Sequence, residues 1–311
     1  FAGMDVRFEN PAGLTGLWAE ENTRASLFDA MWRKETFATS GPRIQLRFFG
    51  GWDYRASMLT RKDWVKAGYA NGVPMGADLP AVKGKAPTFV VWAVKDPTSG
   101  NLDRIQIVKG WSKSGQSFEK VYDVVWAGNR KPDTITGKVP ALASTVDITK
   151  ASFTNTVGAV ELKATWADPD FDPALDAFYY ARAIEIQTPR WTTIQAKELG
   201  IAPPEVVPAT VQERAWSSPI WYAPTADARK AAKLQMTVAE LKQKGATMLN
   251  DAQLKELSVG KSIWLQNNVT NDKFMVAWSP NGQSQIKYAN PKASQPSLVG
   301  DIDRQGYLGL S

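Results

Sequence analysis

Three aspartates at alternate positions are the first residues whose types and spacing could do chemistry. Asp168, Asp170 and Asp172 lie in a segment broken by two prolines, which keep it out of a helix interior and hold the carboxylates on an extended or turning loop. Alternate carboxylates on a loop can converge on Ca²⁺. The EF-hand pattern requires a glycine and a glutamate where this loop has Pro173 and Tyr179. Two interpretations stay open: a weak Ca²⁺ site, and a loop whose aspartates cap neighbouring turns.

A second candidate set lies on an expected strand over residues 178–186 and in the turn after it. Arg182 and Glu185 interrupt the apolar alternation, and Arg190 follows within Thr-Pro-Arg-Trp. Guanidinium groups suit carboxylate or phosphate, so this set could hold a small anionic or ester substrate. The alternative is an Arg–Glu network that braces the strand end. We expect the three side chains to face one solvent-reachable cleft beside residues 18–21. The predicted substrate-binding residues are Arg182, Glu185, Arg190, Trp191, Trp18 and Glu20.

The elements that must position these side chains are mostly strands. Between residues 43 and 222, short runs with period two are separated by Gly, Pro and Asn. Such spacing predicts a β-sandwich. Several tryptophans fall in these runs. They are core residues or, alternatively, exposed platforms for a glycan. The expected strands are 43–49, 88–94, 103–109, 118–125, 159–166, 178–186 and 215–222, and the tryptophans are Trp52, Trp64, Trp92, Trp111, Trp126, Trp166, Trp191, Trp216 and Trp221.

Both ends of the chain have a different character. A strand over 14–19 and a helix over 23–34, capped by Asn22, precede the β-rich region, and the apolar residues of the helix predict one packed face. Those residues are Leu27, Phe28, Met31 and Trp32. After Pro224 the sequence predicts a small α+β module. Its elements are a helix over 227–235, capping boxes at 237–240 and 250–253, strands from 260, over 274–279 and over 284–288 with a turn at 280–283, and a last strand over 304–311.

Composition limits the classes of function. The chain has 311 residues, a net charge of +6, 22% charged residues and neither cysteine nor histidine. Its basic residues are dispersed, which argues against nucleic acid, and no apolar run has the length of a membrane span. Without histidine or cysteine the chain builds neither a Ser-His-Asp triad nor an imidazole- or thiolate-rich metal site. The absence of cysteine fits a periplasmic or secreted protein of the bacterial envelope.

A series of motifs resembles a known family. They are W-A-E-E-N-T-R at 18–24, T-x-G-P-R-I at 39–44, D-P-x-F-D-P at 168–173, F-Y-Y-x-R at 178–182, T-P-R-W-T-T at 188–193 and Q-E-R-A-W-S-S-P-I-W-Y at 212–222. Together they resemble the C-terminal half of the bacterial domain-of-unknown-function family 3604. Its members look like metallohydrolases of the polymerase-and-histidinol-phosphatase (PHP) superfamily. The resemblance implies that residues 14–34 are the last strand and helix of a PHP-type barrel, and that the divalent-metal ligands lie upstream.

The fold expected from all of this is mainly β with an α/β remnant. Its parts are the end of a PHP-like domain over 1–42, a β-sandwich over 43–223 and the small module over 224–311. We expect the chain to be the C-terminal portion of a metal-dependent hydrolase, a phosphoesterase or relative, whose partner is its own upstream half. The chain begins with Phe1 and ends in an apolar strand, which favours a fragment that is inactive alone. The alternative is a non-catalytic envelope module with a Trp-rich, glycan-contacting sandwich.

Overall fold

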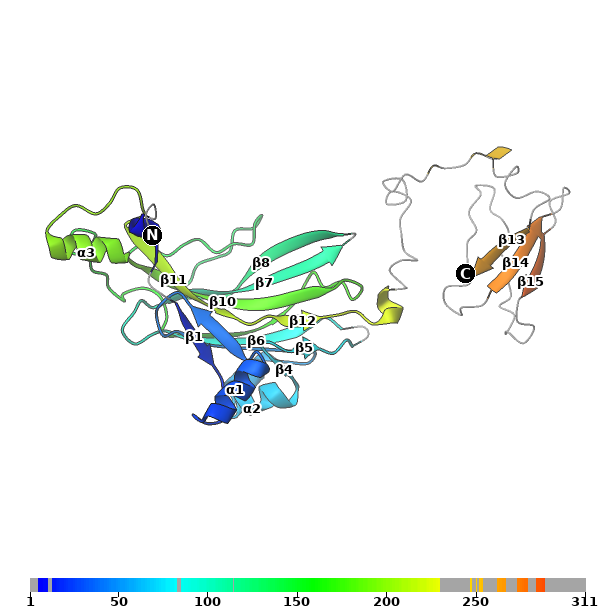
Figure 1. The fold of residues 1–311 in the computed structure, drawn as a ribbon, viewed down its shortest axis with the longest axis horizontal. Coiled ribbons are helices and arrows are strands. Elements are labelled where there is room, and N and C mark those ends of the chain that lie inside the picture. Colours follow the sequence, from blue (N-terminus) through cyan, green and yellow to red (C-terminus); the bar gives the residue numbers. More distant parts are fainter. Residues whose placement is uncertain are drawn as a thin grey trace. The chain divides into compact units, whose positions relative to one another are not determined.

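The protein is represented by a computed structural model that describes residues 5–10, 13–82, 85–113 and 115–229. After these it describes residues 247, 250, 252–253, 262–266, 273–278 and 284–288. The chain divides into two compact units, Phe1–Thr225 and Ala226–Ser311. Figure 1 shows that the first unit is built largely of strands, with few helices.

In its described residues the first unit contains β1 to β12, three α-helices and two 3₁₀-helices. The strands are β1 (Leu14–Leu17), β2 (Thr36–Thr39), β3 (Gln45–Gly51), β4 (Gly72–Pro74), β5 (Asp78–Leu79), β6 (Thr88–Val94), β7 (Leu102–Lys113), β8 (Gln116–Trp126), β9 (Glu161–Ala167), β10 (Ala177–Pro189), β11 (Thr210–Ser217) and β12 (Ile220–Tyr222). The helices are η1 (Val6–Phe8), α1 (Arg24–Trp32), η2 (Ala56–Thr60), α2 (Trp64–Ala70) and α3 (Trp191–Leu199). The seven expected strands between residues 43 and 222 all correspond to strands here.

One of the expected strands is divided in two. The run 215–222 forms the end of β11 and the whole of β12, separated at Ser218 and Pro219. Proline has no N–H to donate to a ladder, so the pairing stops there. The consequence is that β12 pairs with β10 beyond the end of β11 and extends the sheet to β5. This extension brings Trp221 next to Phe178 at the start of β10 and Asp78 next to Trp221.

The strands form two open sheets. In the large sheet the order is β1-β2-β11-β10-β12-β5, and β7 pairs with the other edge of β10 and with β8. In the small sheet the order is β4-β3-β6-β9. Both sheets contribute to one hydrophobic core, an arrangement like that of a β-sandwich. Its fully buried side chains include Leu46, Phe48, Phe89 and Val91 of the small sheet and Ile105, Ile107, Tyr179, Ala181 and Ile220 of the large one.

The outer face of the small sheet has its own cover. Phe49 and Val90 point away from the main core and pack with η2 and α2 through Met58, Leu59 and Ala67. Figure 1 shows α2 beside β4. The alternation of each strand therefore fills two apolar layers, one between the sheets and one under these helices.

The segment expected to end a PHP-type barrel lies in the large sheet. β1 pairs antiparallel with β2, and β2 pairs antiparallel with β11. No compact unit ends at residue 42, because these ladders join residues 14–39 to the strands that follow. Helix α1 forms as predicted, but its N-cap is Thr23, not Asn22.

The prediction that the apolar residues of α1 form one packed face is wrong. Ala30 is buried, whereas Phe28, Met31 and Trp32 are 56%, 52% and 78% exposed. Phe28 and Trp32 stack on each other with ring centroids 6.1 Å apart. Leu27 is half-buried and Ala30 is buried, whereas the other three residues of the predicted face, Phe28, Met31 and Trp32, face outwards.

The second unit contains a three-stranded antiparallel sheet of β13 (Ser262–Gln266), β14 (Lys273–Trp278) and β15 (Ser284–Tyr288). The predicted capping box is confirmed: the N–H of Asn250 donates to Gln253 and the N–H of Gln253 donates to Asn250, both at 3.0 Å. The capping box at 237–240, the turn at 280–283, the strand at 304–311 and most of the helix over 227–235 lie outside the described residues. Nowhere in the described part is a helix long and apolar enough to cross a membrane.

Candidate functional site

Arg182 and Glu185 do not share a cleft. Arg182 lies between two alanines of the core, so strand alternation turns its side chain to the other face of the large sheet. There Nε and Nη2 donate to Oε1 of Gln106, at 2.9 and 2.6 Å. Glu185 is fully buried, with 0% exposure, and its Oε2 accepts from Ser99 at 2.6 Å. The expected solvent-reachable grip on a substrate is therefore not formed by these two side chains.

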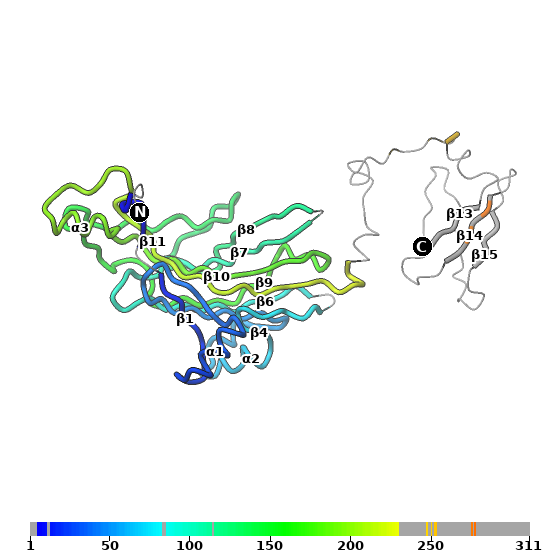
Figure 2. Tube along the Cα trace, viewed as in Figure 1, coloured from blue at the N-terminus to red at the C-terminus, as the bar shows by residue number. Residues whose placement is uncertain are grey.

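Arg190 and Trp191, by contrast, meet at one backbone carbonyl. Nη2 of Arg190 and Nε1 of Trp191 both donate to the carbonyl of Glu9, each at 2.8 Å, and Nη2 also donates to that of Arg7 at 3.2 Å. Arg190 is 8% exposed. Figure 2 shows the N-terminal segment beside α3 and β11. Both side chains hold a chain segment, which occupies Nη2 of Arg190 and Nε1 of Trp191.

The remaining two predicted residues lie elsewhere. Trp18 packs against the small sheet: its Nε1 donates to the carbonyl of Leu46 at 2.9 Å, and the guanidinium of Arg47 lies 3.7 Å from the centre of its ring. Glu20 is exposed. Among the described residues, neither Trp18 nor Glu20 is joined by a hydrogen bond or ion pair to Arg182, Glu185 or Arg190, so these residues do not form one site.

The aspartate loop is held by protein donors. Asp168 is buried and accepts from Lys109 Nζ at 2.6 Å and from the hydroxyl of Tyr179 at 2.7 Å. Asp170 accepts from Lys120 at 2.5 Å and from the hydroxyl of Tyr122 at 2.6 Å. The hydrogen bond from Lys120, followed by that from Tyr122, lowers the pKa of Asp170. The two carboxylates thus point to different lysines.

The third aspartate caps its own turn, as Asp172 accepts from the N–H of Ala174 at 2.9 Å. In the described part of the chain, no three His, Cys, Asp or Glu side chains form a group that could hold a metal ion. The side chains present therefore do not fit the histidine- and carboxylate-rich centre of a PHP-type enzyme, nor the convergent Ca²⁺ site considered from the sequence.

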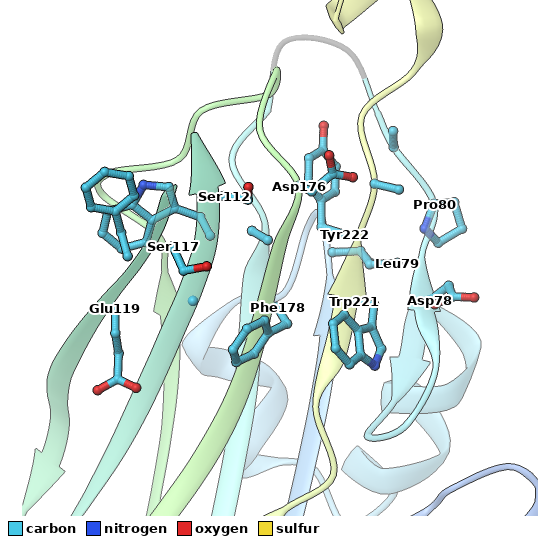
Figure 3. A pocket seen from close by; sticks show the side chains of 16 residues that line it. Asp78, Leu79, Pro80, Ser112, Ser117, Glu119, Asp176, Phe178, Trp221 and Tyr222 are labelled. Carbon is cyan, nitrogen blue, oxygen red and sulfur yellow. The ribbon is translucent and has the colours of Figure 1, made fainter. Parts of the chain in front are cut away.

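A groove of about 840 Å³ lies on the large sheet of the first unit. We call it the aromatic groove. It lies where β8, β7, β10, β12 and β5 are neighbours, and Figure 3 shows its lining side chains. Five aromatic residues line it: Trp111, Phe118, Phe178, Trp221 and Tyr222. Its volume is in the range of sites for small ligands.

The centre of the groove is one row of residues in register across the five strands. Glu119 is opposite Gly110, Gly110 is opposite Phe178, Phe178 is opposite Trp221, and Trp221 is opposite Asp78. Partners in register lie on the same face of a sheet. Figure 3 shows Phe178 and Trp221 side by side, with Glu119 on one side of them and Asp78 on the other. The row is an aromatic platform with a carboxylate at each end.

The glycine of this row is required by the ring beside it. A Cβ on Gly110 would lie 2.3 Å from Cζ of Phe178, so the ring rests on the bare backbone of β7. On its other side Phe178 contacts Trp221, with ring centroids 5.3 Å apart. Trp221 is 47% exposed. Phe178 is therefore fixed from both sides, while Trp221 offers its ring to solvent.

Polar groups border the platform. Ser112, Ser117 and Asp176 line the groove, and Figure 3 shows them at the same end of it. No lysine or arginine is among its lining residues in the described part of the chain. The groove therefore offers aromatic faces, hydroxyl groups and carboxylate acceptors, and it repels anions.

Comparison with known proteins gives a family. The family model DUF3604, described as a protein of unknown function, matches residues 2–224. This chain belongs to that family. The match ends where the first unit ends, so the aromatic groove lies within the DUF3604 region. No curated protein and no solved structure matches the chain.

The groove of this DUF3604 protein was not among the sites predicted from the sequence. The sequence suggests the tryptophans as core residues or as platforms for a glycan, but it does not indicate that Trp111 and Trp221 line one groove. A local signal for the platform exists, because Gly110 precedes Trp111 in β7 and Phe178 opens an alternating run in β10. The register that aligns these residues with Trp221 is set by the pairing of the whole sheet, so it cannot be predicted from the sequence of one strand.

Proposed function

We propose that the first unit is a binding module whose ligand is a carbohydrate, held in the aromatic groove. The observation that supports this most is the row Glu119–Gly110–Phe178–Trp221–Asp78. Sugar rings have an apolar face that stacks on aromatic side chains and hydroxyl groups that donate to carboxylates. A flat platform with acceptors at its ends offers both contacts.

The charge of the groove argues for this class over the anionic substrate expected at first. Its charged lining residues are Asp78, Glu119 and Asp176. A phosphate or carboxylate placed there would meet like charges and no guanidinium or ammonium group of the described residues. An uncharged polyol meets no such penalty.

The test is a titration of the whole chain with soluble oligosaccharides, followed by tryptophan fluorescence. We expect Trp221→Ala to weaken binding about 10-fold or more, since an aromatic stacking contact is worth about 1–3 kcal/mol in comparable platforms. Trp32→Ala is the matched control, because Trp32 is also exposed but lies on α1, and it should leave binding unchanged. Equal binding by Trp221→Ala and the unaltered chain would remove the groove from the proposal.

The second candidate function is a metal-dependent hydrolase of the PHP type, of which this chain supplies the non-metal part. Two observations favour it: membership of DUF3604, with the motifs that resemble it, and the outward face of α1. Phe28, Met31 and Trp32 are exposed there. A helix at the end of a barrel packs such a face against barrel strands, so we propose that the metal-binding half of the protein covers it, in the periplasm or outside the cell.

Hydrolysis is then expected only with that half present. This chain, loaded with Zn²⁺ or Mn²⁺, should not turn over a panel of chromogenic phosphoesters, because it has no histidine or cysteine to bind such ions. Coexpression with the metal-binding half should give turnover that a chelator abolishes. Chelator-sensitive turnover by this chain alone would contradict the proposal, as would no turnover by the coexpressed pair.

A further inference from the structure

We infer that the aromatic groove selects glycans with protonated amino groups, such as oligomers of glucosamine, over neutral and acidic glycans. This inference rests on the proposed carbohydrate-binding function and deepens it. It starts from a contrast of charge. The chain as a whole has a net charge of +6, yet all of the charged residues that line the groove are acidic. The charge of the residues that line the groove is thus opposite in sign to the net charge of the chain.

The two carboxylates at the ends of the row are available to a ligand. Asp78 and Glu119 are both exposed, and neither side chain has a hydrogen-bond or ion-pair partner among the described residues. Elsewhere in the unit, aspartates are commonly paired, as Asp168 is with Lys109 and Asp170 with Lys120. Carboxylates without an internal cation are the ones that can pair with a cation of the ligand.

The spacing fits a ligand longer than one ring. Glu119 lies on β8 and Asp78 on β5, and three strands, β7, β10 and β12, lie between them. Neighbouring strands are about 4.8 Å apart, so the ends of the row are separated by roughly 19 Å. That distance is several times the width of a sugar ring. An oligomer that crosses the strands would reach both carboxylates with Phe178 and Trp221 under its middle.

The aromatic platform favours the same ligands. An ammonium group beside the face of a tryptophan gains cation–π attraction, which Trp221 can offer because its ring is open to solvent. An acetylated amine keeps the stacking contact and loses both the ion pair and the cation–π attraction. A uronic acid is repelled by the carboxylates. The groove therefore ranks the three types of sugar by charge.

The experiment compares two ligands of equal length by calorimetry, a glucosamine oligomer and an N-acetylglucosamine oligomer, at a pH where the free amines are protonated. We expect the glucosamine oligomer to bind about 10-fold tighter at low ionic strength, the size expected of a few solvent-exposed ion pairs, and this preference to shrink strongly at high salt. Asp78→Asn with Glu119→Gln should remove most of this preference and leave only the smaller part that comes from cation–π attraction to Trp221. Glu20→Gln, an exposed glutamate outside the groove, should keep the preference.

The outcomes separate the two claims. Equal affinity of the unaltered chain for both oligomers overturns the charge selection and leaves carbohydrate binding in place. An undiminished preference in the double variant also overturns it, because the amine would then be recognised by groups other than the two carboxylates. Binding of neither oligomer, with no effect of Trp221→Ala on any glycan, overturns the proposed function itself. Circular dichroism of the double variant establishes that it is folded before its affinities are compared.

Discussion

Asp168→Asn is expected to destabilise the protein by about 3–5 kcal/mol, because it leaves the ammonium of Lys109 buried without a counter-ion. The side chains of Lys109 and Asp168 are 5% and 0% exposed, and Nζ lies 2.6 Å from Oδ2. Lys109 also donates to the carbonyl of Asp170 at 2.7 Å. A hydrogen bond to the neutral amide introduced by Asp168→Asn or to the carbonyl of Asp170 does not replace the negative charge that is lost. Lys109→Met should have an effect of similar size, since it leaves the carboxylate buried.

The measurement is urea unfolding of the single variants and of the double variant Lys109→Met with Asp168→Asn. The double variant should lose less stability than the two single variants together, because no buried charge is left unpaired. The exposed pair Lys120–Asp170 is the matched control. Its side chains are 51% and 49% exposed and its atoms are 2.5 Å apart, so breaking it should cost only about 0–1 kcal/mol. Equal losses for the two pairs would contradict the role of burial.

Glu185→Gln is expected to change how stability depends on pH. Burial, with the nearby charges of Glu213 and Asp96, raises the pKa of Glu185 from its ordinary value of 4.5 to about 7. Between these values the folded protein keeps a proton that the unfolded chain releases. The unfolded state then binds fewer protons than the folded one, so this group makes stability fall as pH rises from 4.5 to about 7. Above that range the loss is complete and constant.

The size of this effect is on the order of 3 kcal/mol, since each pH unit corresponds to about 1.4 kcal/mol. Near pH 4 the Glu185→Gln variant should have the same free energy of unfolding as the unaltered protein. Above neutral pH the variant should be the more stable of the two. Unfolding measured over this pH range tests the difference between the two proteins, so other titrating groups cancel. Glu20→Gln, in which an exposed glutamate is changed, should follow the unaltered protein throughout. If the stability of Glu185→Gln and that of the unaltered protein changed with pH in parallel, the carboxyl of Glu185 would not titrate in this range.

Much of the fold is local enough for the sequence to determine. Period-two runs between turn residues predicted the strands, and the reciprocal side chains of Asn250 and Gln253 predicted a cap that forms. The family was recognised from motifs alone. Each of these signals depends on neighbours in the chain, so no knowledge of tertiary contacts was needed.

The site was decided by tertiary structure. Charge and spacing suggested that Arg182, Glu185 and Arg190 act together, but each is held by a partner far away in sequence: Gln106, Ser99 and the carbonyl of Glu9. Type and spacing do not reveal such partners. The platform likewise requires that Phe178 and Trp221 fall in register, and a shift by one residue would turn either ring to the other face. Register is set by packing of the whole sheet, which the sequence of any one strand does not contain.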